Sequence, residues 1–201
     1  GFLMVDNFLF HVTQAAQAGT EGWRIFKYDA ATWELLTDTF FPLGSQRLDN
    51  GAPMDAYVNG RIDISSGYTV TEEPPDADTP AGEYGTHHQF FSLDLQFLEE
   101  RIIAEPPHIH GHYMVFVDGI YYLVTANLYT EDVILAKYDT EWNYLGGRTL
   151  IPQAHFSTGL VFDGQRFYVA YTDTSQRTEP GFFPVALNIH LAAFDRDWNL
   201  V

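Results

Sequence analysis

Two hairpin motifs alternate four times along this chain, and that alternation restricts the fold more than any other feature. The first motif ends a strand with an aromatic residue or leucine, then has an aspartate at a turn and a large aromatic residue beyond it. Its copies are Tyr28-Asp29 with Trp33, Leu93-Asp94 with Phe97, Tyr138-Asp139 with Trp142, and Phe194-Asp195 with Trp198. Aspartate suits the first position of a turn because its carboxylate accepts backbone N–H groups. We expect the repeated aromatic residues to pack within or between the repeats.

The second motif is a tight hairpin between two apolar strands. Its copies lie at 5–10, 58–64, 117–124 and 162–171, with turns at Asp6-Asn7, Asn59-Gly60, Asp118-Gly119 and Asp163-Gly164. Asn-Gly and Asp-Gly supply the positive φ angles that two-residue hairpin turns require. The pattern therefore predicts a two-residue turn in each copy.

Two hairpins in strict alternation give four-stranded units of roughly fifty residues, the size and order of β-propeller blades. The sequence predicts an all-β chain with negligible helix, a single β-propeller domain over 1–201 with blades at about 1–43, 44–106, 107–152 and 153–201. Four four-stranded blades are expected, or nearly so, because the fourth stops before an outer strand. Either the outer strand is missing, or the chain is a fragment of a five-bladed or larger propeller, or another copy fills the incomplete blade edge.

The charge and composition exclude several classes of partner. The net charge is −17 with ten basic residues, so no basic stripe is present for nucleic acid or an anionic membrane surface. No apolar run approaches the ~20 residues of a membrane helix. Cysteine is absent, which excludes disulfides, thiol catalysis and cysteine metal sites. The compartment is undecided, with a periplasmic or extracellular location favoured.

The connections that share one end of the blades predict a site. Two of them are long, 68–85 and 172–188, and long loops in compact domains are often functional. Alignment on the hairpin glycines puts Gly51, His110 and His155 nine residues before Gly60, Gly119 and Gly164.

Two histidines thus occupy matching positions at the expected channel mouth. His112, Asp49, Asn50 and Asp55 are expected beside them. Imidazole and carboxylate groups together suit a polar ligand or a divalent metal ion, with His110 and His155 as the metal ligands. The remaining histidines of the strands, His11, His87, His88 and His190, are interpreted as structural.

The tandem hairpins with Asp-Gly turns and aromatic strand ends resemble β-propeller repeats over essentially the whole chain. They are distantly similar to five-bladed sugar-processing propellers, in which carboxylates from the inner strands of the first three blades surround the channel mouth. Here Asp49 and Asp55 are the only acidic residues near such an entry, and the next two blades offer His110 and His155, or Met114 and Gly159. The catalytic pattern is not matched, so no catalytic residue is carried over.

Three functions remain open from the sequence. The first is binding of a small polar ligand, a carbohydrate, with stacking on aromatic residues at the same end, Tyr84, Phe156, Phe182 and Phe183. The second is a glycoside hydrolase, which needs two carboxyl groups ~5–10 Å apart. The third is a protein interaction scaffold.

Overall fold

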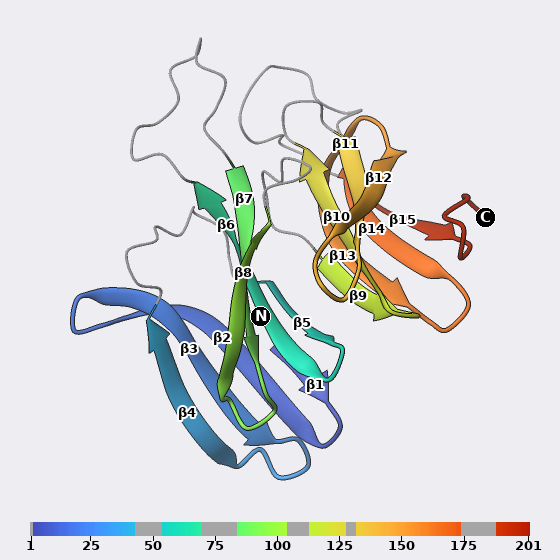
Figure 1. Cartoon of the computed structure of the whole chain (residues 1–201). Coiled ribbons are helices and arrows are strands. Elements are labelled where there is room, and N and C mark those ends of the chain that lie inside the picture. The colour runs from blue at the N-terminus through green and yellow to red at the C-terminus, as the bar shows by residue number, and fades with distance from the viewer. Residues whose placement is uncertain (1, 43–53, 70–83, 104–112, 128–131, 174–187) are drawn as a thin grey trace. The chain divides into compact units, whose positions relative to one another are not determined.

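The computed structural model describes residues 2–42, 54–69, 84–103, 113–127, 132–173 and 188–201. These residues form fifteen β-strands and no helix (Figure 1). The expectation of an all-β chain is confirmed. No helix in this part of the chain is long and apolar enough to cross a membrane.

The strands form four antiparallel sheets in chain order. The first contains β1 (Phe2–Val5), β2 (Phe8–Gln17), β3 (Thr20–Asp29) and β4 (Leu35–Pro42); the second contains β5 (Met54–Val58), β6 (Arg61–Thr69), β7 (Tyr84–Phe91) and β8 (Phe97–Ile103). The third contains β9 (Tyr113–Val117), β10 (Ile120–Asn127), β11 (Asp132–Tyr138) and β12 (Tyr144–Ile151); the fourth contains β13 (Ala154–Phe162), β14 (Phe167–Asp173) and β15 (Ile189–Phe194).

The described residues of the fourth sheet form three strands in the order β13-β14-β15, so this blade stops before an outer strand, as the sequence predicted. Beyond β15 the chain makes an isolated bridge between Phe194 and Leu200. The chain divides into two compact units, residues 1–104 and 105–201, with two sheets in each.

The turn before the outer strand recurs in all four sheets, and it has an unusual backbone. Trp33, Leu95, Trp142 and Trp198 all have positive φ, between 58° and 66°. Each donates its N–H to the carbonyl of the residue that opens the turn, Asp29, Ser92, Asp139 or Asp195. The side chain of that residue accepts further backbone N–H groups; Asp139 Oδ1, for example, accepts from Glu141 at 3.0 Å and Asn143 at 2.8 Å. The side-chain bond from Asn143 is the main reason that the pKa of Asp139 is lowered.

The second sheet corrects our alignment of this motif. Its turn opens at Ser92, not Asp94, and its positive-φ residue is Leu95, not Phe97. The serine hydroxyl accepts N–H groups as the aspartates do, at 3.3 Å from Asp94 and 3.1 Å from Gln96. The expected packing role holds for the buried Trp198 and the half-buried Trp142. It also holds for Phe97, which is 50% exposed but packs edge-on against Phe91 of the same hairpin at 5.9 Å. Trp33, at 71% exposed, does not fit it.

The inner hairpins follow the sequence in three sheets of four. The pairs Val5 with Phe8, Val58 with Arg61, and Val117 with Ile120 each enclose two turn residues. In the fourth sheet Phe162 pairs with Phe167, so Asp163–Arg166 connect the strands and the two-residue expectation is wrong there. The Asp163 carboxylate explains the difference, because Oδ1 accepts the N–H groups of Gln165 and Arg166 at 2.7 and 2.8 Å.

The register gives each sheet two faces, which we name by residues that occupy equivalent positions. The leading face carries Leu9, His11, Tyr28 and Trp33 in the first sheet; Ile62, Ile64, Phe91 and Leu95 in the second; Tyr121, Leu123, Tyr138 and Trp142 in the third; and Phe167, Val169, Phe194 and Trp198 in the fourth. The trailing face carries the residues that alternate with these: Phe10, Val12 and Ile25; Asp63, Ser65 and His88; Tyr122, Val124 and Leu135; and Tyr168, Ala170 and Leu191.

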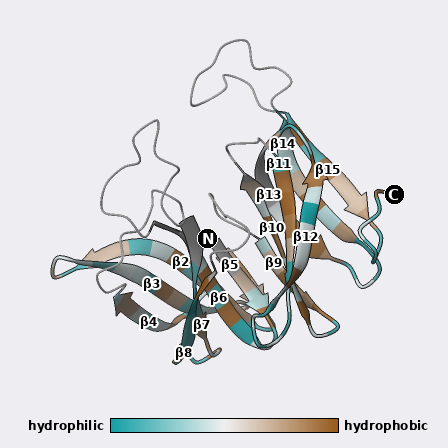
Figure 2. Cartoon of the chain, turned by 45° about the horizontal axis from the view of Figure 1, so that its top comes forward, coloured by the Kyte–Doolittle hydropathy of each residue, from teal (hydrophilic) through white to brown (hydrophobic). Residues whose placement is uncertain are grey.

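Each unit is held by a trailing face packed on a leading face. In residues 1–104 one core joins Phe10, Val12 and Ile25 to Ile62, Ile64, Phe91 and Leu95. In residues 105–201 another joins Val124 and Leu135 to Phe167, Val169, Phe194 and Trp198. Figure 2 shows hydrophobic residues, in brown, in the strands of both units. Burial of such apolar surface is the main term that favours folding.

Replacement of Gly119 by valine tests the inner hairpin. Gly119 has φ +81°, and an added Cβ would meet nothing within 4 Å. The cost is therefore conformational, and we expect Gly119→Val to lower the free energy of unfolding by about 1–2 kcal/mol. Gly159→Ala is the control, since its Cβ would make an ordinary contact with Ala170 at 3.7 Å without positive φ. Equal effects of the two substitutions in urea unfolding would contradict the assignment.

Replacement by glycine, which tolerates positive φ, should have a large effect on stability at the buried Trp198 and a small one at the exposed Trp33. Trp198 is 4% exposed and stacks on Phe167 with ring centroids 4.1 Å apart. Trp198→Gly should lose about 2–4 kcal/mol, the cost of the lost packing less the relief of backbone strain. Trp33→Gly should change the free energy of unfolding by less than about 1 kcal/mol. A comparable loss in both variants, measured by urea unfolding, would contradict the account.

Candidate functional site

The trailing face of the second sheet breaks the apolar pattern of the other three. Asp63 on β6 stands where they carry Phe10, Tyr122 and Tyr168, and His88 on β7 stands where they carry Ile25, Leu135 and Leu191. Asp63 and His88 are nevertheless 1% and 0% exposed. The repeat shows that apolar residues fit these positions, so the buried polar pair is specific to this sheet.

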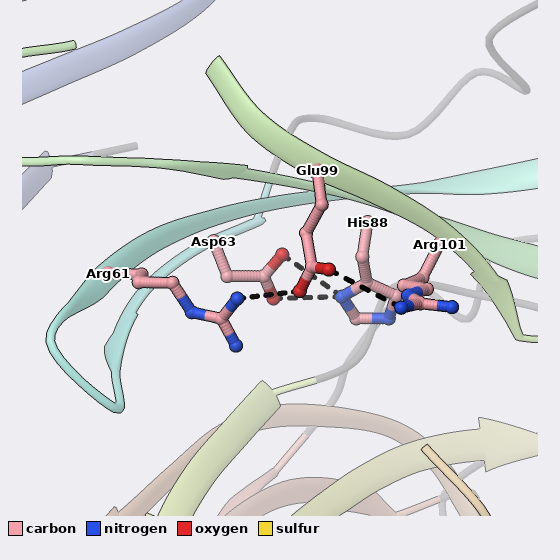
Figure 3. Close-up of polar contacts among 5 residues, drawn as sticks. All are labelled: Arg61, Asp63, His88, Glu99 and Arg101. Carbon is pink, nitrogen blue, oxygen red and sulfur yellow. Dashed lines mark hydrogen bonds and ion pairs between the residues drawn. The ribbon is translucent and has the colours of Figure 1, made fainter. Parts of the chain in front are cut away.

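Asp63 and His88 bond directly to each other across the neighbouring strands (Figure 3). His88 Nδ1 lies 2.8 Å from Asp63 Oδ2 and 3.0 Å from Oδ1. An ionised carboxylate only accepts hydrogen bonds, so this contact assigns a hydrogen to Nδ1. The pair therefore fixes the ring orientation of His88 and keeps a hydrogen on Nδ1, directed at the carboxylate.

Three more charged residues continue the polar face from β6 to β8. Arg61 Nη1 donates to Glu99 Oε1 at 2.6 Å, and Arg101 Nη2 donates to Glu99 Oε2 at 3.4 Å (Figure 3). Arg61 also lies over the ring of Phe90, with its guanidinium carbon 4.5 Å from the ring centroid. We call Arg61, Asp63, His88, Glu99 and Arg101 the polar face of the second sheet.

The buried Asp63–His88 pair contributes little to the free energy of unfolding, which points to a role other than stability. Buried polar and charged pairs gain little more from their contact than they lose in desolvation, and apolar replacements of similar volume are often neutral or stabilising. An imidazole oriented by a carboxylate is the pairing used by acid–base and metal-binding histidines. Its burial keeps His88 from direct contact with bulk water. The polar face is the strongest candidate functional feature among the described residues.

Two other histidines occupy equivalent positions, on β7 and β15, and each contacts a carboxylate. His87 Nε2 lies 3.1 Å from Glu100 Oε2, and His190 Nε2 lies 2.6 Å from Asp173 Oδ2. Burial lowers the pKa of His87, and Glu100 opposes that shift only in part. These contacts agree with the structural interpretation of both residues.

Most of the site expected from the sequence falls outside the described residues. This is true of Asp49, Asn50, His110 and His112. Asp55 lies in β5, where its backbone pairs with Ile64, and His155 lies in β13 at a register shift; the side chains of both are outside the described part.

The register also bears on the alignment used for that site. Because the fourth hairpin is built differently, Gln165 rather than Gly164 occupies the position of Gly119. The alignment that matches His155 to His110 counts from Gly164, and is therefore one residue out of register. The described residues contain no group of three or more His, Asp or Glu side chains arranged to hold a metal ion. The site at His110 and His155 stays a prediction.

In comparisons with known proteins, no family model and no curated protein matches this chain. Solved structures do match over its whole length. A GH43 β-xylosidase/α-arabinofuranosidase from a compost microbial metagenome, in complex with xylotriose, has a TM-score of 0.63 at 14% identity, covering 100% of this chain and 71% of that one. A GH43_1 enzyme from Xanthomonas citri has a TM-score of 0.62 at 14% identity, covering 100% and 70%. A thermostable family-43 glycoside hydrolase has 0.59 at 13%, covering 99% and 72%.

These likenesses establish the fold. The chain has the β-propeller fold, and its four sheets are blades of the kind found in these proteins. The expected similarity to sugar-processing propellers is confirmed at the level of architecture. At 13–14% identity the comparison carries no residue role from those enzymes to this blade set.

The polar face was missed by sequence reasoning, although the sequence contains a signal for it. Aligning the second and third strands of each repeat places an aspartate and a histidine in columns that are otherwise aromatic or aliphatic. The turns and their glycines carry no information on these strand positions, so the turn pattern leaves Asp63 unmarked and indicates only a structural role for His88.

The Asp63–His88 pair can be tested by comparing single and double substitutions. Asp63→Ala leaves a buried imidazole without its carboxylate and should lose about 3–5 kcal/mol in urea unfolding. Asp63→Val/His88→Leu restores the apolar character of the other blades and should unfold within about 1 kcal/mol of the wild type. A double variant as unstable as the single one would show that the pair is needed for the fold itself.

Proposed function

We propose that this chain is a carbohydrate-binding β-propeller whose ligand is a small sugar or oligosaccharide. The observation that carries the proposal is the likeness over the whole chain to propellers solved with xylotriose or xylose bound. Ligand sites in proteins are concave, and a few well-placed polar groups are enough to orient a ligand in them. The charge of −17 supports a neutral polar ligand over nucleic acid.

The binding residues we propose are His110 and His155, with His112, Asp49, Asn50 and Asp55 beside them. They combine donors and acceptors suited to sugar hydroxyl groups, and neutral imidazoles could also hold a divalent ion there. The polar face of the second sheet supports the same blade from within. Its bonds between β6, β7 and β8 hold the strand that pairs with β5, which carries Asp55.

Glycoside hydrolysis is the second candidate, favoured by the activities in the names of the similar structures. It requires an acid and a second carboxylate ~5–10 Å apart and able to reach the sugar. The carboxylates of the polar face do not meet this need, because Asp63 is bonded to His88 and Glu99 to two arginines. Binding is therefore the function that we place first.

Titration with xylotriose tests the proposal and separates the two candidates. We expect saturable binding by calorimetry, its loss in His110→Ala/His155→Ala, and no release of xylose during prolonged incubation. His11→Ala is the control, since His11 stacks between Phe2 and Phe26 on the leading face of the first sheet.

Each other outcome has a definite meaning. Release of xylose would show that the protein hydrolyses the sugar. Binding that survives in the double variant would show that the site does not include these histidines. Absence of binding across xylose, xylotriose and arabinose, by folded protein with and without a divalent ion, would overturn the carbohydrate proposal.

A further inference from the structure

The side-chain amide of Gln89 is buried without a partner for its oxygen. Gln89 lies on β7, on the leading face of the second sheet, and is 5% exposed. No donor among the described residues reaches its Oε1. The equivalent positions of the other sheets carry Phe26, Ala136 and Ala192, so the amide is specific to this sheet. A buried acceptor left unsatisfied is costly, and it therefore indicates a bound water, ion or ligand.

Two ionisable side chains share this face with Gln89. Glu100 on β8 pairs directly with Gln89, which places their Cβ atoms ~4.5–5.5 Å apart. His87 precedes Gln89 by two residues on β7, so both side chains project from the same face of the strand. The side chain of His87 is 3% exposed and that of Glu100 is 56% exposed. The three groups thus form a cluster that is buried at the imidazole and open to solvent at the carboxylate.

The first sheet shows that a positive charge fits this place. Its Arg24, at the position of His87, donates to Asp38 at 2.8 and 2.6 Å. Asp38 in turn occupies the position of Glu100. In the second sheet burial lowers the pKa of His87, so the ring is mainly neutral at pH 7. The second sheet thus replaces a guanidinium–carboxylate pair by a neutral imidazole beside a carboxylate.

The spacing of the cluster suits a metal ion. His87 Nε2 lies 3.1 Å from Glu100 Oε2. Zinc lies ~2.1 Å from an imidazole nitrogen or a carboxylate oxygen, so two such ligands at ~90–110° around one ion are ~3.0–3.4 Å apart. An ion can therefore take the place of the hydrogen between the two atoms with little movement of either side chain. The amide oxygen of Gln89 is a further neutral metal ligand on the same face.

We propose that His87, Gln89 and Glu100 bind a divalent metal ion of the zinc type, through Nε2, the amide oxygen and a carboxylate oxygen. An imidazole ligand favours Zn²⁺ and its transition-metal neighbours over Ca²⁺ and Mg²⁺, which prefer oxygen ligands. The ion links β7 to β8, so the site is structural, and water completes its coordination. It uses other residues than the site proposed at His110 and His155, and the inference does not depend on the carbohydrate proposal.

Zinc titration of the full chain tests the site, in the His110→Ala/His155→Ala background so that those histidines take no part. After removal of metal with EDTA, calorimetry should show saturable binding of one zinc ion. Zinc should also raise the midpoint of urea unfolding, because it binds the folded chain. Glu100→Gln should weaken zinc binding by more than about 100-fold, since even groups that only orient a metal ligand contribute about 10- to 100-fold. Asp38→Asn, at the equivalent carboxylate of the first sheet, is the control and should bind zinc like the background protein.

A gain of affinity provides the second test. Gln89→Glu puts a charged oxygen ligand in place of a neutral one, so it should bind zinc at least about tenfold more tightly. Without zinc the same variant should unfold at a lower urea concentration, because it buries an additional carboxylate.

Three results overturn the proposal: absence of saturable zinc binding, equal zinc affinity in Glu100→Gln, or an affinity of Gln89→Glu that is unchanged or lower. Zinc binding by the wild type but not by the background protein would belong to His110 and His155, and would likewise contradict a site at Gln89.

Discussion

The apolar contact between the trailing face of one sheet and the leading face of the next is the interaction on which each unit depends. A lone antiparallel sheet of three or four strands leaves two faces in water, and only a packed neighbour buries enough surface to offset the entropy of ordering the chain. In residues 1–104 this contact brings the ring centroids of Phe41 and Phe91 to 4.4 Å, and Lys27 donates to the Leu93 carbonyl at 2.8 Å from the other sheet. In residues 105–201, Tyr122 contacts Phe167, and Arg196 donates to Asp118 at 2.6 Å.

The repeated turn makes this contact possible at a conformational cost. A bulky residue with positive φ is unusual, and here the position recurs with tryptophan three times and leucine once. In the second and fourth sheets that residue inserts into the core with the preceding sheet, which offsets the strain of its backbone. In the third sheet Trp142 stacks on Tyr121 with centroids 4.4 Å apart. At Trp33, which is 71% exposed, burial offsets much less of this strain than at Leu95 or Trp198.

The sequence predicted architecture well because architecture depends on local patterns. The alternation of hairpins determines strand order, and the turn at Asp139 or Asp195 is fixed by bonds within five residues. It predicted less well where a different side chain does the same physical task, as Ser92 does for aspartate, or where Asp163 reorganises a turn. The polar face required comparison of the same position in four blades, since neither Asp63 nor His88 is unusual within its own strand.

The two sheets of a unit should fold and open together because they share a core, and the other inferences depend on this coupling. Amide hydrogen exchange followed by mass spectrometry measures this directly. We expect β2 and β3 to exchange with the same free energy of opening as β6 and β7, and β10 and β11 to match β14, in the slowest class of each unit. If β2 and β3 stayed protected while β6 and β7 exchanged independently and much faster, the shared core would not be what holds the two sheets together, and the account would be contradicted.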